Sequence, residues 1–112
     1  GLLRQKLAKS LVGIEIMRLN CLRAFSKSLK GAPRGAEASM NKLYWSHVMQ
    51  DMFDTAMEVL GPLAPLTAGD AHAVDGGRFQ LGFLRSKAFT IYSGSSEIQR
   101  NIIAERVLGL PK

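Results

Sequence analysis

The amino-acid sequence predicts an all-α fold, an antiparallel helical bundle with two long helices followed by shorter C-terminal helices. Along residues 3–29 and 36–60, apolar side chains recur mostly three or four positions apart, which is the period of an amphipathic helix. Glycine and proline end both stretches. No stretch alternates between apolar and polar residues for long, as a half-buried strand would. These 112 residues therefore fit a single small α-helical domain.

The first helix is expected from Leu3 to Leu29. Lysines and arginines lie between its apolar residues, which are Leu3, Leu7, Leu11, Ile14, Leu22, Phe25 and Leu29. Cys21 lies in this stretch and is expected to pack rather than to react. Residues 30–35 end the helix, because glycine favours a C-terminal cap and Pro33 cannot continue a helix. So short a connection predicts that the next helix runs antiparallel to the first.

The second helix is expected from about Ala36 to Leu60. Its core stripe is predicted to consist of Met40, Leu43, Tyr44, Val48, Met52, Ala56, Val59 and Leu60. Trp45, Met49 and Phe53 widen this stripe, which predicts contacts on two sides of the helix. Exposed apolar surface on these three residues would suit contacts with another subunit or domain.

The rest of the chain predicts a loop and two shorter helices. Gly61 and Pro62 end the second helix, and residues 63–77 have little periodicity, which is typical of an irregular loop. Helices are expected from Arg78 to Phe89 and from Ser96 to Leu108. Ser96 with Gln99 fits the capping-box pattern at the start of the last helix. Its inward-facing residues are predicted to be Ile98, Ile102, Ile103 and Val107.

The net charge of +6 raises nucleic acid or another anion as a partner. The 15 lysines and arginines are scattered along the chain, however, and no zinc-finger spacing accompanies them. A solvated helix face explains most of them, so we do not expect nucleic acid to be a partner. A stand-alone basic helical module that binds a protein or nucleic acid is the competing function class.

Metal and membrane partners are not expected either. Two histidines and one cysteine without ligand spacing predict no metal site, and His47 is expected to be a partly buried packing residue. No apolar run approaches the roughly 18 to 20 residues that a membrane span needs. We therefore expect a cytoplasmic location.

A turn of small residues precedes the last helix. Ser93, Gly94, Ser95 and Ser96 offer backbone N–H groups, side chains that permit close approach, and the positive end of a helix dipole. Such a turn suits an anionic or carbonyl-bearing ligand. The alternative is a simple N-cap, in which the serines satisfy the amides of the helix itself.

The stretch IYSGSSEIQRNIIA, residues 91–104, closely resembles the C-terminal signature of the acyl-CoA dehydrogenase family, Tyr-Glu-Gly-Thr-Ser-Glu/Gln-Ile-Gln-Arg. The resemblance extends more loosely over nearly the whole chain, through residues 58–61 and 83–88. It implies the last helical domain of a longer chain, whose N-terminal helical domain and middle β-domain carry much of the flavin and substrate site. It also implies a homo- or hetero-oligomer.

The resemblance implies a reaction and its site residues. Members of the family dehydrogenate an acyl-CoA thioester between its α and β carbons and pass a hydride to FAD. By this resemblance, Ser93 and Gly94 approach the acyl-CoA substrate, whereas Ser95, Ser96 and Glu97 contact FAD. The similarity to the family is lower at Glu58 and Pro62, where its Gln-x-x-Gly-Gly run approaches FAD, so we expect no cofactor contact there.

Ser93 occupies the position of the family's common catalytic glutamate. An unassisted serine hydroxyl is too weak a base to take an α-proton near neutral pH, so we expect no catalytic residue in this chain, which alone should be inactive. The backbone N–H of Ser93 can still donate to the thioester carbonyl. The base would lie on an earlier helix of the parent chain, as in branches resembling the isovaleryl- and long-chain enzymes. Alternatively, a partner subunit of a hetero-oligomer supplies a complete site, and this subunit is catalytically silent. In a third reading, the protein has lost dehydrogenation.

Overall fold

The structure, a computed structural model, describes residues 1–31, 35 and 37–111. They form four α-helices and two short 3₁₀ turns, which are α1 (Leu2–Leu29), α2 (Glu37–Leu60), η1 (Gly61–Leu63), η2 (Val74–Gly77), α3 (Arg78–Ala88) and α4 (Ser96–Arg106). None of these described residues lies in a strand, so the all-α prediction is confirmed. The expected start of the second helix at Ala36 lies outside the described residues.

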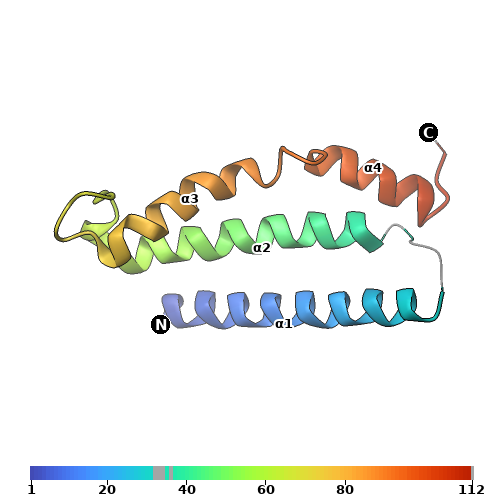
Figure 1. Cartoon of the computed structure of the whole chain (residues 1–112), viewed down its shortest axis with the longest axis horizontal. Coiled ribbons are helices and arrows are strands. Elements are labelled where there is room, and N and C mark those ends of the chain that lie inside the picture. Colours follow the sequence, from blue (N-terminus) through green and yellow to red (C-terminus); the bar gives the residue numbers. More distant parts are fainter. Residues whose placement is uncertain (32–34, 36, 112) are drawn as a thin grey trace.

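The second helix is the centre of the bundle. Figure 1 shows α1 antiparallel to α2 along one side, while α3 and α4 follow one another along the other side. Each of these three helices contacts α2. The predicted antiparallel pairing and the two-sided contacts of the second helix are therefore confirmed.

The contact between α1 and α2 is made largely by small and polar residues. Gly13 is the buried residue of α1, and a Cβ atom built on it would lie 3.1 Å from the methyl groups of Val48. On the N-terminal side of Gly13 along α1, Lys6 pairs with Glu58, and Lys9 Nζ lies 2.7 Å from an Asp51 carboxylate oxygen. A residue without a side chain lets the two backbones approach, and charged pairs fix their register.

The apolar face of α1 points away from α2. Leu7, Leu11 and Phe25 are 54%, 63% and 62% exposed, although the amphipathic pattern that they form predicted the helix correctly. Cys21 is also exposed, so the expectation that it packs is wrong for this chain. The face with the smaller and more polar residues is the one that packs.

The other side of α2 is covered by aromatic side chains and small residues. The rings of Trp45 and Phe89 lie 4.6 Å apart, and Gly82 on α3 packs directly against the Phe53 ring. Ser86 on α3 is fully buried. Trp45 and Phe53 thus contact the residue that follows α3 and α3 itself, respectively. Neither of them nor Met49 is exposed, so the expectation that these three residues offer exposed surface to another subunit is wrong.

The loop between α2 and α3 is partly ordered by the two 3₁₀ turns. Gly77 adopts a φ of 80°, and a Cβ there would lie 2.6 Å from the backbone nitrogen of Ala68. The buried Gln80 side chain donates to the Leu63 carbonyl at 3.2 Å. The predicted loop of residues 63–77 therefore folds back on itself before α3 begins.

The last helix begins at Ser96, as predicted, but its N-cap and its last residue differ from the prediction. Ser95, not Ser96, is its N-cap, and the Ser95 hydroxyl accepts from the Ile98 N–H at 3.4 Å. The capping box of Ser96 with Gln99 is therefore wrong. The helix ends at Arg106 and not at Leu108. Ile98 and Val107 are about half exposed at 51% and 47%, because only one narrow face of this short helix meets α2.

Candidate functional site

The turn between α3 and α4 has a backbone that favours glycine. Ser93 and Gly94 have positive φ angles of 55° and 88°. A non-glycine residue in this left-handed region costs on the order of 1 kcal/mol, so the surrounding contacts must hold it there. The Ser96 N–H donates to the Thr90 carbonyl at 3.0 Å and closes the turn.

Two side chains from different helices hold the carbonyl groups of this turn. Gln99 Nε2 on α4 donates to the Ser93 carbonyl at 2.9 Å, and Lys42 Nζ on α2 donates to the Gly94 carbonyl at 2.6 Å. Both hydrogen bonds are partly buried. A Cβ on Gly94 would lie 2.6 Å from Gln99 Nε2, so the first bond requires glycine at this position.

The N–H groups of the same peptides point the opposite way. Every peptide bond in the described residues is trans, and the N–H of a trans peptide is antiparallel to its carbonyl. The N–H groups of Gly94 and Ser95 are thus directed away from Gln99 and Lys42. Among the described residues, no atom accepts a hydrogen bond from either of them. The turn therefore presents two fixed donors.

A polar pocket of about 370 Å³ lies between α2 and the start of α4. It is lined by His47, Gln50, Thr90, Ile91, Ser95, Ser96, Glu97 and Arg100. Ser96 is only 5% exposed, yet its hydroxyl has no hydrogen-bond partner among the described residues. Buried hydroxyls are normally hydrogen-bonded, so the Ser96 hydroxyl beside this pocket lacks a partner that a water molecule or a ligand would supply.

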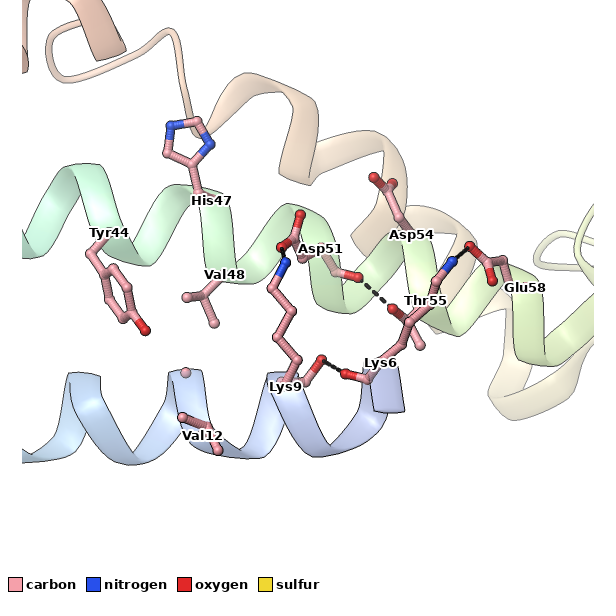
Figure 2. Close-up of a pocket in the computed structure, with 12 residues that line it drawn as sticks. Lys6, Lys9, Val12, Tyr44, His47, Val48, Asp51, Asp54, Thr55 and Glu58 are labelled. Atoms are coloured by element: carbon pink, nitrogen blue, oxygen red, sulfur yellow. Dashed lines mark hydrogen bonds and ion pairs between the residues drawn. The ribbon is translucent and has the colours of Figure 1, made fainter. Parts of the chain in front are cut away.

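His47 lies beside this pocket. Figure 2 shows its ring on the side of α2 that points away from α1, toward the chain between α3 and α4. The residue is exposed, so the expectation that it is a partly buried packing residue is wrong.

Glu97 supplies the carboxylate of the pocket. Its own backbone N–H lowers its pKa most, followed by the hydroxyl of Ser95, and the charges of Arg100 and His47 act in the same direction. The Glu97 carboxylate is therefore ionised at neutral pH and acts as a hydrogen-bond acceptor. A carboxylate with a lowered pKa is poorly suited to remove a proton from carbon.

The structure gathers all five residues that the sequence singled out. Ser93 and Gly94 form the turn, and Ser95, Ser96 and Glu97 begin the helix that follows it. Sequence reasoning missed the supporting residues Lys42, Gln50, Thr90, Gln99 and Arg100. The sequence held one signal for Lys42, a charged residue on the apolar side of α2: it lies three positions before Trp45 and seven before Met49.

A second pocket, of about 430 Å³, lies between α1 and α2 (Figure 2). Lys6 pairs with Glu58 across it, and Lys9 pairs with Asp51. The hydrogen bond to Asp51 and the charge of its carboxylate raise the pKa of Lys9. The Thr55 hydroxyl donates to the Asp51 carbonyl at 2.7 Å. Because these polar groups satisfy one another, we interpret this pocket as a helix seam.

The described residues hold no cluster of three or more side chains that could bind a metal ion. Likewise, none of the helices in the described part of the chain is long and apolar enough to cross a membrane.

Comparison with known proteins gives a consistent picture. The family described as "Acyl-CoA dehydrogenase, C-terminal domain" matches residues 1–108. Acyl-CoA dehydrogenase IpdE1 from Mycolicibacterium smegmatis is 40% identical over 114 residues, which cover 99% of this chain and 26% of that protein. IpdE1 from Mycobacterium tuberculosis is 36% identical over 111 residues, which cover 99% of this chain and 27% of that protein. The chain thus spans about a quarter of the length of these relatives.

Solved structures agree with the observed architecture. The ChsE4–ChsE5 complex from Mycobacterium tuberculosis contains a chain that superposes with a TM-score of 0.85 at 28% identity, over 98% of this chain and 28% of that one. A structure described as the Tcur3481–Tcur3483 steroid ACAD superposes with a TM-score of 0.90 over 100% of this chain and 29% of that one. Its identity of 24% supports the fold alone.

Proposed function

Since the chain belongs to the acyl-CoA dehydrogenase family through its C-terminal domain, we propose that it is one domain of a longer, cytoplasmic flavin-dependent enzyme. That enzyme removes hydrogen from the α and β carbons of an acyl-CoA thioester. This domain supplies contacts to substrate and FAD, and the catalytic base lies outside it. The observation that carries the proposal is the pair of fixed N–H donors at Gly94 and Ser95, beside a pocket with an unpartnered hydroxyl.

The substrate side of the site is assigned to Ser93 and Gly94. When the α-proton leaves, negative charge develops on the thioester oxygen, and fixed backbone donors stabilise such charge without having to reorient. Gly94 also lets a ligand approach the backbone closely, because it has no side chain. The hydroxyl of Ser93 takes no part in the proton transfer.

The cofactor side is assigned to Ser95, Ser96 and Glu97. When bound, FAD supplies the hydride acceptor. The residues present fit such a group: the buried Ser96 hydroxyl lacks a partner, and the ionised Glu97 carboxylate accepts hydrogen bonds from hydroxyl groups. The helix N-terminus adds the positive end of a dipole, which favours the negative parts of a ligand.

The base is assigned elsewhere on chemical grounds. Ser93 is too weak a base, and the pKa of Glu97 is lowered rather than raised. A glutamate on an earlier helix of the parent chain is the reading that we favour. In the alternative, a partner subunit carries the complete site and this subunit is silent.

An oligomer is part of the proposal. The structural neighbours are described as pairs of proteins, ChsE4–ChsE5 and Tcur3481–Tcur3483. The exposed apolar face of α1 gives this chain a surface that the rest of the parent protein or a second subunit can cover.

The ion pairs of this chain argue against the competing function, a nucleic-acid-binding module. Lys6, Lys9, Lys27 and Lys87 each pair with a carboxylate of α2. Their charge is therefore locally balanced and does not form a basic surface with the remaining cations.

The test is product analysis with the full-length parent protein, purified with any partner encoded beside it. We would incubate it with linear, branched and steroid-like acyl-CoAs and an electron acceptor, and we expect a product lighter by two hydrogen atoms. The Ser93→Glu variant serves as a second sample, because it places a carboxylate at the position of the family's common catalytic glutamate. FAD-bound protein that is inactive until Ser93→Glu restores the product would indicate the silent subunit. Inactivity of both samples with every acyl-CoA would contradict dehydrogenation.

A further inference from the structure

Lys42 differs from the other paired lysines of this chain. Lys6, Lys9, Lys27 and Lys87 pair with carboxylates in exposed positions. Lys42 instead lies on the apolar side of α2 and donates to a backbone carbonyl in a partly buried contact. Partial burial of an ammonium group is unfavourable unless it makes a strong hydrogen bond. The position of Lys42 is therefore best explained by its contact with Gly94.

We propose that Lys42 is a positioning residue for the ligand-binding turn. It holds the Gly94 carbonyl on the α2 side, so that the N–H of the same peptide, which belongs to Ser95, faces outward. Gln99 holds the preceding peptide in the same way and turns the Gly94 N–H outward. The identity of the ligand, a thioester carbonyl or a flavin oxygen, depends on the function proposed above. The restraint that Lys42 places on the turn does not depend on that function.

The restraint acts through orientation and polarisation. A peptide group is planar, so fixing its oxygen fixes the direction of its hydrogen. A charged donor on the oxygen also draws electron density toward it, which makes the N–H of that peptide a better donor. The positive φ angle of Ser93 is unfavourable, and glycine at position 94 can adopt many other conformations. Loss of the contact from Lys42 or from Gln99 should therefore let the turn relax.

The first experiment measures amide hydrogen exchange in the full-length protein. The reporter is the Ser96 N–H, whose bond to the Thr90 carbonyl closes the turn. Lys42→Met removes the donor and keeps the length of the side chain, and Lys42→Arg keeps the charge. Lys9→Met is the matched control, because it removes an α1 ammonium that contacts α2 near Asp51.

We expect Lys42→Met to speed exchange at Ser96 roughly tenfold, as for the loss of one hydrogen bond to a charged group. Lys42→Arg should restore most of the protection, and Lys9→Met should leave Ser96 unchanged. Unchanged exchange at Ser96 in Lys42→Met would overturn the proposal, whether or not the protein is a dehydrogenase.

A measurement on the unaltered protein covers the case in which Lys42→Met fails to fold. Amine-selective labelling followed by mass spectrometry should modify Lys42 much more slowly than the exposed Lys9 and Lys30. Equal labelling rates would mean that Lys42 does not bind Gly94 in solution, and they would overturn the proposal.

The kinetic constants kcat and KM distinguish a positioning role of Lys42 from a purely structural one. With an acyl-CoA that the enzyme turns over, Lys42→Met should lower kcat roughly tenfold and change KM less, because the aligned donors act on developing charge. Lys42→Arg should recover much of kcat. A rise in KM with unchanged kcat would contradict the positioning of a transition-state donor, while the exchange data would still report on the turn.

Discussion

The Gln99 side chain occupies the space that a Cβ atom on Gly94 would need. The distance from such a Cβ to Gln99 Nε2 would be 2.6 Å, and the same Nε2 donates to the Ser93 carbonyl at 2.9 Å. The absence of a side chain at Gly94 and the amide of Gln99 therefore work together. They set the conformation of the turn that precedes α4.

Replacing Gly94 with alanine should displace Gln99 and strain the backbone. We expect Gly94→Ala to destabilise the protein by about 1–3 kcal/mol and to weaken FAD binding. The matched control is Gly69→Ala, because Gly69 also has a positive φ, of 102°, but open space around it. Thermal unfolding and flavin absorbance would be measured for both variants of the full-length protein. Equal flavin content in the two variants would contradict a role for this turn in cofactor binding.

Replacing Ser96 with alanine should separate ligand binding from stability. The Ser96 hydroxyl has no partner among the described residues, so its loss should change the stability of the flavin-free protein by less than about 0.5 kcal/mol. FAD affinity should fall by about tenfold if the hydroxyl binds the cofactor. Thermal unfolding and a fluorescence titration with FAD test both statements.

Ser86→Ala is the control for that experiment. Ser86 is also fully buried, but its hydroxyl donates to the Phe83 carbonyl at 2.7 Å. We expect Ser86→Ala to destabilise the protein by about 1 kcal/mol and to leave FAD affinity unchanged. The reverse pattern in the two serine variants would refute the assignment of Ser96 to the cofactor site.

The close approach of α1 and α2 should depend on Gly13. A larger side chain there meets the methyl groups of Val48, so we expect Gly13→Leu to destabilise the protein by about 1–3 kcal/mol. Val48→Ala should relieve part of this loss, which a double-mutant cycle by thermal unfolding would detect. Strictly additive effects would mean that the two residues are not in contact.

The lowered pKa of Glu97 predicts a pH dependence. Because the folded-state pKa lies below the ordinary value of 4.5, the carboxylate stabilises the folded protein above that pH, and the contribution disappears as the pH falls through the folded-state pKa. The difference in melting temperature between the unaltered protein and Glu97→Gln should therefore be largest near neutral pH and vanish in acid. A difference that persists at pH 3 would point to packing instead.

Local sequence patterns predicted the helices well, because apolar residues recur three or four positions apart and glycine or proline follows the two long helices. The four predicted helices begin and end within two residues of the observed ones wherever both ends are described. Periodicity identifies an apolar face but not what covers it. For this reason, the exposed face of α1 and the packing of Trp45 against Phe89 could not be read from the sequence.

The candidate site was predictable in part for a related reason. The run of small residues before a helix is a local signal, and it located residues 93–97. The contact between Lys42 and Gly94 joins positions 52 residues apart, and the capping residue depends on a backbone angle at Ser95. Both are set by tertiary structure, which single-sequence patterns do not encode.

The most direct test of the central claim is an anaerobic absorbance titration of the full-length protein with acyl-CoA. Our account predicts a yellow protein whose visible flavin band bleaches as acyl-CoA is added, and a Gly94→Ala variant that binds less flavin or bleaches less. A colourless protein that takes up no FAD, or a flavin band that no acyl-CoA bleaches even in Ser93→Glu, would contradict the account.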